Sequence, residues 1–97
     1  MSKQYDISEI AALLAGRAEA VCQWLLPQGK REGREWRAGS IGGDAGQSLG
    51  VNLSGKAGVW RDFADSAKGG DLIDLIQAVH GCNKAEAVKE AKEFLGI

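Results

Sequence analysis

A group of basic and aromatic side chains in the middle of the chain has the residue types that bind a polynucleotide. Its members are Lys30, Arg31, Arg34, Trp36, Arg37, Lys56, Trp60 and Arg61. Cations bind phosphates whatever the base sequence, and an aromatic ring on a sheet can stack on an unpaired base for about 1–3 kcal/mol. The group predicts binding to a single strand, with Trp60 as a stacking ring. The alternative is that both tryptophans belong to the core of a small sheet and the cations to a solvated face.

The segment Lys68-Gly69-Gly70 supplies a further candidate for binding phosphate. Amides at the start of the helix expected after it would be free to bind an anion beside the lysine. From residue 28 to residue 68 there are seven cations and five acids, whereas the rest of the chain has five cations and eight acids. The net charge of −1 conceals this basic middle, which is compatible with one surface that attracts phosphate.

Nucleotide and metal sites have less support. Residues 50–57 nearly match the P-loop pattern, but Ala57 stands where that loop needs Ser or Thr, and a strand rather than a helix is expected to follow. A structural zinc site needs about four ligands, often in Cys-x2-Cys pairs. The chain offers Cys22, which we expect in the core, and His80 and Cys82 on either side of Gly81. We therefore expect neither a metal nor a cofactor.

Catalysis by clustered carboxylates is also disfavoured. Asp62 and Asp65 are close in sequence, and so are Asp71 and Asp74, but the chain has a single histidine and no metal scaffold to work with them. Asp71 and Asp74 fall in the first turn of an expected helix, where acids stabilise the helix dipole. We expect no catalytic residues, and no enzyme activity from this chain alone.

The bulk composition indicates one globular domain. The chain has 97 residues, of which 44% are hydrophobic and 26% charged, and it contains no run of the about 20 apolar residues that a membrane helix needs. Its first residues lack the apolar core of a secretory signal, and two cysteines do not make a disulfide framework. We expect a cytoplasmic protein with no membrane partner.

Residues 1–27 are expected to form a helical segment, as two short helices or one kinked helix. Asp6 followed by Glu9 is typical of a helix N-cap, and apolar residues recur at helical spacing as far as Leu26. Glycine lowers the stability of a helix, so we place the break near Gly16, and Pro27 closes the segment.

Residues 28–97 are expected to form a sheet followed by two helices. Strands are predicted at 35–40, 48–53 and 59–63, and glycine-rich hairpins would join them into an antiparallel meander, which a fourth strand at 29–34 would extend. Gly81 would end one helix, and Asn83 with Glu86 would begin the next. The predicted fold is α+β, with a three- to four-stranded sheet covered by helices in one compact domain, 1–97.

Five stretches resemble, in order, the zinc-ribbon domain that begins bacterial DnaG-type DNA primases, a domain with relatives in phage and plasmid primase–helicases. They are Trp36 to Ser40, Ser48 to Val51, Trp60 to Phe63, Gly69 to Leu75 and Glu86 to Ile97. The resemblance covers roughly the last two thirds of the chain, and its most specific parts are Gly-Gly-Asp-x2-Asp-Leu and the terminal Leu-Gly-Ile. The segment through Pro27 is similar to what precedes this domain in phage-type members.

The zinc ligands of the family are missing from this chain. Where the family has Cys-x2-His and Cys-x2-Cys, this sequence has Arg37 with Ser40 and Asp62 with Asp65. The resemblance implies a zinc-ribbon-like fold without metal, and we expect Arg37 to pair with Asp62 or Asp65 across the former site. Because exposed ion pairs contribute only about 0–1 kcal/mol, packed aromatic rings should do most of the stabilising. The rings are Trp36, Trp60 and Phe63.

The function implied by the resemblance is that of a non-catalytic accessory. In the family this domain is thought to contact single-stranded template and help choose where primers start, while a separate Toprim domain holds the catalytic metals. By that likeness the chain would be the DNA-binding domain of a phage- or plasmid-type primase in DNA replication. Its phosphate contacts would be Arg31, Arg34, Arg37, Lys56, Arg61 and Lys68. The alternative is a protein-interaction module that docks onto a helicase or the primase catalytic domain without binding DNA.

Overall fold

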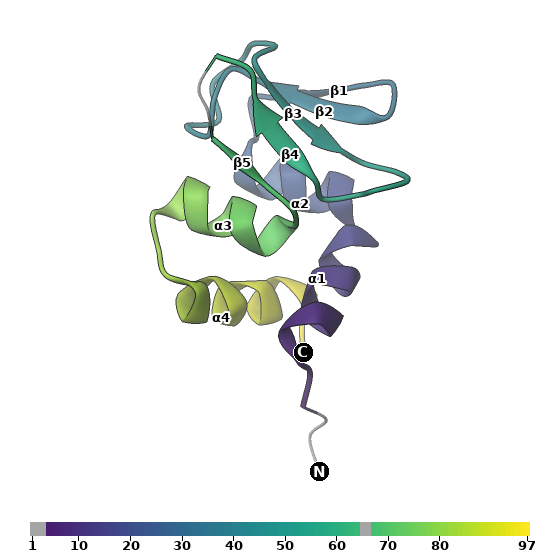
Figure 1. Cartoon of the computed structure of the whole chain (residues 1–97), viewed down its shortest axis with the longest axis vertical. Helices are drawn as coiled ribbons and strands as arrows, with labels where there is room; N and C mark the ends of the chain where they lie inside the picture. Colours follow the sequence, from purple (N-terminus) through teal and green to yellow (C-terminus); the bar gives the residue numbers. More distant parts are fainter. Residues whose placement is uncertain (1–3, 65–66) are drawn as a thin grey trace.

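The computed structural model describes residues 4–64 and 67–97, and in these ranges it has four helices and a five-stranded sheet (Figure 1). The helices are α1 (Ile7–Ala15), α2 (Ala18–Leu25), α3 (Leu72–His80) and α4 (Lys84–Leu95). The strands are β1 (Lys30–Glu32), β2 (Glu35–Ala38), β3 (Leu49–Asn52), β4 (Trp60–Asp62) and β5 (Lys68–Gly69). The predicted α+β class is confirmed.

The first helix, α1, begins at a capping box formed by its own residues. The Asp6 side chain accepts a hydrogen bond from the Glu9 amide, and the Glu9 carboxylate accepts one from the Asp6 amide, so the capping box forms. Helix α1 ends at Gly16, and α2 begins two residues later. The segment therefore forms two helices rather than one kinked helix.

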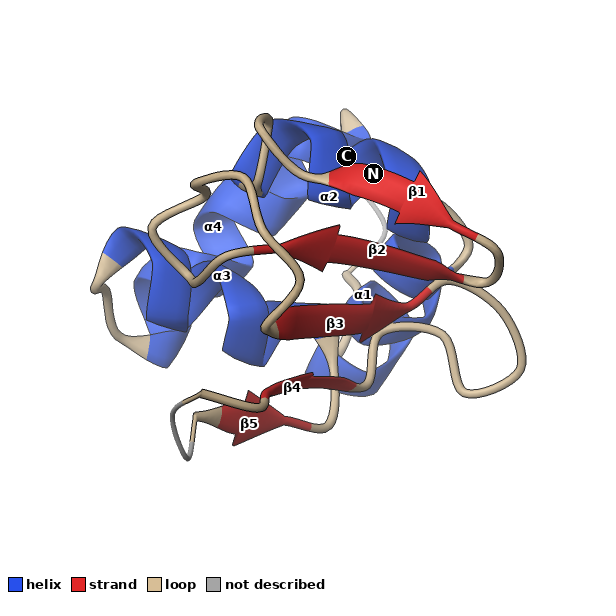
Figure 2. Ribbon diagram, turned by 90° about the horizontal axis from the view of Figure 1, so that it is seen from above, coloured by secondary structure: helices blue, strands red, loops and turns tan. Residues whose placement is uncertain are grey.

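The sheet is an antiparallel meander in which the strands lie in chain order, β1-β2-β3-β4-β5. It has five strands where three or four were predicted. The strand expected at 29–34 is present as β1, while β5 was not predicted, because two residues are too few to show an alternation of apolar and polar side chains. All four helices lie on one side of the sheet (Figures 1 and 2). We call the side turned away from the helices the outer face.

The C-terminal helices close the layer beneath the sheet. Helix α3 ends at Gly81, which has a left-handed φ of 63°, and α4 begins with the predicted capping box of Asn83 and Glu86. The ring of Trp24 in α2 stacks on Phe94 in α4, with centroids 4.8 Å apart. One buried core runs from Ile10 in α1 through the sheet to Ala91 in α4, so the helices and the sheet share it.

Two tryptophan side chains join the sheet to the helical layer. Trp36 in β2 donates a hydrogen bond from Nε1 to the carbonyl of Leu26, at 3.1 Å. Trp60 in β4 donates from Nε1 to the carbonyl of Asp71, at 3.2 Å, just before α3. Both rings are therefore structural. None of the helices in the described ranges has the length and apolar character needed to cross a membrane.

Candidate nucleic-acid interface

Four cations lie in one row across the outer face. The register pairs Lys30 with Arg37, Arg37 with Gly50, Gly50 with Arg61, and Arg61 with Lys68, so the row crosses all five strands. Residues directly opposite one another in antiparallel strands have side chains on the same face. We call Lys30, Arg37, Arg61 and Lys68 the cationic row. Its centre is Gly50, which has no side chain.

Phe63 lies beside this row with its ring exposed. It follows Arg61 by two residues, which places it on the same face, and 63% of it is exposed. The guanidinium carbons of Arg61 and Arg37 are 5.4 Å and 5.6 Å from the ring centroid. These contacts are within the range of a cation–π interaction. The outer face thus combines a row of cations with a ring that is open to solvent.

Arg37 is held in place by its neighbours. Its Nη2 donates to Oε1 of Glu35 at 2.7 Å, and its Nη1 donates to the carbonyl of Gln47 at 3.1 Å. The side chain is less exposed than those of the other cations in the row. Arg37 therefore presents a fixed charge, whereas Lys30, Arg61 and Lys68 are exposed.

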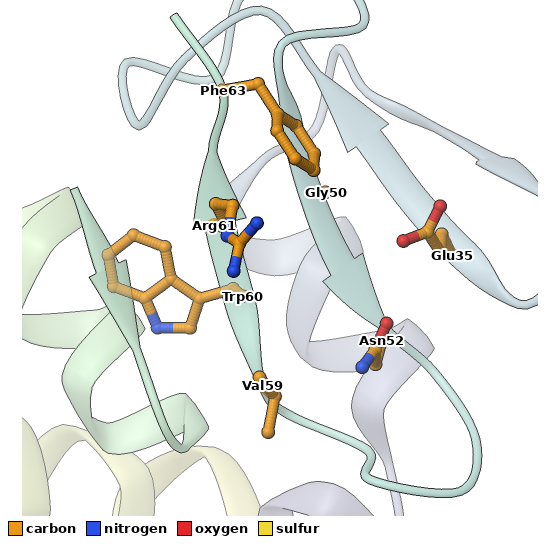
Figure 3. A pocket seen from close by; sticks show the side chains of 7 residues that line it. All are labelled: Glu35, Gly50, Asn52, Val59, Trp60, Arg61 and Phe63. Carbon is orange, nitrogen blue, oxygen red and sulfur yellow. The ribbon is translucent and has the colours of Figure 1, made fainter. Parts of the chain in front are cut away.

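The prediction of Trp60 as a stacking ring is wrong. Trp60 is 4% exposed and Trp36 is 6% exposed, because both side chains point toward the helices. In Figure 3 the Trp60 indole turns away from Arg61 and toward β5 and α3. Phe63, which the resemblance predicts to pack with the two tryptophans, is instead an exposed ring on the outer face.

The other predicted phosphate contacts lie away from the row. Arg31 is on the helix side of β1, where it pairs with Glu19 of α2 at 2.7 Å. Arg34 lies in the turn between β1 and β2, and Lys56 lies in the connection between β3 and β4. The amide of Leu53 donates to the carbonyl of Arg34, so these two exposed cations are at the same end of the sheet. Arg31 is not part of the outer face.

The backbone phosphate site predicted at Lys68-Gly69-Gly70 does not form. The amide of Gly70 donates to Oδ2 of Asp74 at 3.2 Å, and the amide of Asp74 donates to Oδ1 of Asp71 at 2.9 Å. Two carboxylates of the chain therefore lie beside the amides of Gly70 and Asp74, where they would repel an anion. This confirms Asp71 and Asp74 as helix-stabilising acids. Lys68 remains a candidate contact through its side chain alone.

The predicted ion pair does not form at the positions that align with the zinc ligands of the domain that this sequence resembles. Arg37 lies on the outer face and pairs with Glu35, whereas Asp62 is 5% exposed on the helix side and accepts a hydrogen bond from the Ala64 amide at 2.9 Å. Side chains on opposite faces of one sheet cannot meet, so this pair does not form. Ser40 donates to Asp44, and Asp65 lies outside the described residues.

The cysteines and the histidine serve the packing of the helices. His80 Nδ1 is 2.6 Å from Oε1 of Glu90, and the Cys82 thiol donates to Oε2 of the same carboxylate at 3.7 Å. Burial raises the pKa of the Cys22 thiol to about 12, and the charge of Glu19 contributes to the rise. Among residues 4–64 and 67–97, no three His, Cys, Asp or Glu side chains are placed to hold a metal ion.

Two hollows flank Arg61 on the outer face. The first, shown in Figure 3, has a volume of about 180 Å³ and is lined by Glu35, Gly50, Asn52, Val59, Trp60, Arg61 and Phe63. The second has about 340 Å³ and is lined by Val59, Trp60, Arg61, Lys68, Gly69 and Gly70. Glu35, Gly50 and Asn52 were not among the predicted site residues. The alternation along β2 and β3 could have placed them beside Arg37.

Comparisons with family models, with curated proteins and with solved structures found no match to this chain.

Proposed function

We propose that this chain binds single-stranded DNA through the outer face of its sheet. The observation that carries the proposal is the cationic row with the exposed ring of Phe63 beside it. Strands in a sheet are about 4.8 Å apart, so a row across five strands spans about 19 Å. That length suits several consecutive phosphates of one strand rather than a single anion.

An unpaired strand fits this face better than a duplex does. The ring of Phe63 can stack only on a base whose flat side is exposed, and bases inside a duplex already stack on their neighbours. Arg37 and Arg61 are near the same ring, so one nucleotide can have its base on Phe63 and its phosphate beside a guanidinium. Such contacts tolerate any base sequence.

The resemblance to primases suggests the setting for this binding. A zinc-ribbon-like domain of a phage- or plasmid-type primase would hold the template strand during primer synthesis, while a separate domain forms the bonds. The chain would then be a non-catalytic accessory. The cationic row lies on strands β1 to β5, and the stretches that carry the resemblance include β2, β3 and β4.

One observation favours the alternative of docking onto a protein. Ile7 and Leu13 of α1 are 45% and 40% exposed, and a separate hollow of about 280 Å³ is lined by Tyr5, Glu9, Ala12 and Leu13. Exposed apolar side chains that gather at a hollow are typical of protein-binding surfaces. A helicase or the primase catalytic domain would be the partner. Docking at α1 leaves the outer face open.

Titration of a fluorescent oligothymidylate tests DNA binding. We expect binding that weakens between about 50 and about 200 mM salt, with a log–log slope near −3 if all four cations of the row contact phosphates, at about 0.7 per contact. Arg61→Ala should weaken binding and make the slope shallower by about 0.7, because one phosphate contact is lost.

The matched control is Lys89→Ala, which removes the same charge from an exposed position on α4. It should leave both the affinity and the slope close to those of the unchanged protein. Absence of binding at the lower salt concentration would exclude the DNA-binding proposal and favour docking. Equal losses in the two variants would mean that net charge matters and the row does not.

A further inference from the structure

One residue that lines the first hollow beside Arg61 is a glycine, Gly50, although the backbone conformation there would allow other residues. Gly50 lies in the middle of β3, and its φ is not in the left-handed range that favours glycine. Glycine within a strand is less stable than alanine, and it often marks a place where another group approaches the backbone closely. A Cβ at this position would be 3.3 Å from Nη1 of Arg37. The missing side chain leaves room for that guanidinium, which lies over the buried Gly50 at the edge of the hollow.

One cation, Arg61, and one carboxylate, Glu35, line the hollow, so their charges offset and do not favour a phosphate. The carboxylate of Glu35 lines one side, and directly opposite it in the register is Asn52. One carboxylate oxygen, Oε1, accepts from Arg37, and within the described residues the side-chain amide of Asn52 has no hydrogen-bond partner. A carboxylate repels phosphate but accepts from N–H donors, and an amide both donates and accepts. The occupant should be uncharged and should offer N–H groups.

The size and position of the hollow point to one nucleobase. Its volume of about 180 Å³ is below the about 300–1,000 Å³ of pockets that enclose whole small ligands. In Figure 3 the ring of Phe63 lies beside Gly50, and Glu35 and Asn52 lie on the other side of the hollow. A base stacked on the Phe63 ring could thus turn its hydrogen-bonding edge toward Glu35 and Asn52.

Guanine is the base whose edge complements these groups. Its pairing edge has two adjacent donors, N1–H and the N2 amino group, with the acceptor O6 beside them. A carboxylate can accept from both donors while an amide donates to O6. Thymine has one donor on this edge, and adenine and cytosine each have a single amino group next to an acceptor that would face the carboxylate.

We propose that the hollow formed by Glu35, Gly50, Asn52 and Phe63 binds one guanine of a single strand held by the cationic row. This rests on the proposed function, because the phosphates beside the base occupy the row. The general contacts give affinity without sequence preference, and the hollow adds a preference at one position.

The test compares short oligothymidylates that differ only at one central position. We expect the oligonucleotide with guanine there to bind about fivefold or more tightly than those with thymine, adenine or cytosine. Hypoxanthine at the same position lacks the N2 amino group and should lose most of the advantage. Equal binding of all five would overturn the guanine site and leave the proposed function intact. Absence of binding to any of them would overturn both.

Glu35→Gln tests the guanine site through the ratio of two affinities. The substitution keeps the size of the side chain but removes the double acceptor and one negative charge. The ratio of affinity for the guanine-containing oligonucleotide to affinity for plain oligothymidylate should fall to near one, and the ratio is the readout because Glu35 also contacts Arg37 of the cationic row. Glu93→Gln on α4 is the matched control and should keep the preference. If Glu35→Gln folds, as its thermal melting will show, and still prefers guanine, the inference is wrong.

Discussion

Phe63 has the exposure of a surface residue rather than that of a core residue. Its ring is mostly exposed, so replacing it should change the free energy of unfolding by no more than about 0.5 kcal/mol. Phe63→Ala should weaken binding of an oligothymidylate about fivefold or more, because stacking contributes about 1–3 kcal/mol per base. The salt slope should not change, since no phosphate contact is lost. Titration at two salt concentrations, with urea unfolding of the same variant, measures all three quantities.

Phe63→Trp is the control, because it keeps a ring that can stack and should bind at least as tightly as the unchanged protein. If Phe63→Ala binds the oligonucleotide normally, or if it loses several kcal/mol of stability, then Phe63 has a structural role and does not bind DNA. Together with Arg61→Ala, which should change the slope, this variant distinguishes stacking from charge at two residues that are neighbours on one face.

The roles of single residues were partly predictable from the sequence. The cations of the middle segment were identified, and four of them meet in one row. The stacking ring was misassigned, although adjacent residues of a strand point to opposite faces. Trp60 and Arg61 could not both face a ligand, and neither could Trp36 and Arg37. Phe63, two residues beyond Arg61, was the ring compatible with Arg61.

At the scale of elements, the end of α3 depends on a backbone conformation that side chains rarely adopt. Gly81 has a φ of 63°, and no atom within 4 Å would meet a Cβ there. Gly81→Ala should therefore lower the free energy of unfolding by about 1–2 kcal/mol through backbone strain alone. Chemical unfolding followed by tryptophan fluorescence measures the loss.

Gly70→Ala provides the matched comparison. A Cβ at Gly70 would also meet no atom within 4 Å, but the φ of Gly70 lies outside the left-handed range. Alanine there reduces the freedom of the unfolded chain, so stability should stay the same or rise by about 0.4–1 kcal/mol. Equal losses in the two variants would show that the φ of Gly81 is not what makes its glycine necessary.

Helix ends that depend on capping residues close in sequence were predictable. A strand that exists only because it pairs with another strand was not. The capping boxes at Asp6 and Asn83 and the left-handed Gly81 marked helix ends that the structure has. Strand β5 has two residues and exists because it pairs with β4, so no pattern within it could indicate a strand. The same is true of the cationic row, because the register between strands decides which cations are neighbours.

The two faces of the sheet differ in what covers them and in their charge. All four helices lie on one face of the sheet, and the segments that contain them, 1–27 and 69–97, have eight acids and five cations, while the cationic row lies on the opposite face (Figure 1). A strand approaching from the outer side meets the cationic row first, and the sheet lies between it and the more acidic helical layer. Net charge alone, at −1, would have hidden this arrangement.

The one-sided core also predicts that folding does not depend on zinc. Small ribbons usually need the metal because they bury too little apolar surface by themselves. Here the sheet packs on helices from both ends of the chain. The indole of Trp36 donates a hydrogen bond to a backbone carbonyl that precedes the sheet in the sequence, and the indole of Trp60 donates to one that follows it. Purified protein should contain no stoichiometric zinc, and its Tm should be the same with a chelator, without one, and with added zinc. One bound zinc per chain whose removal unfolds the protein would show that coordination, and not this core, holds the sheet to the helices.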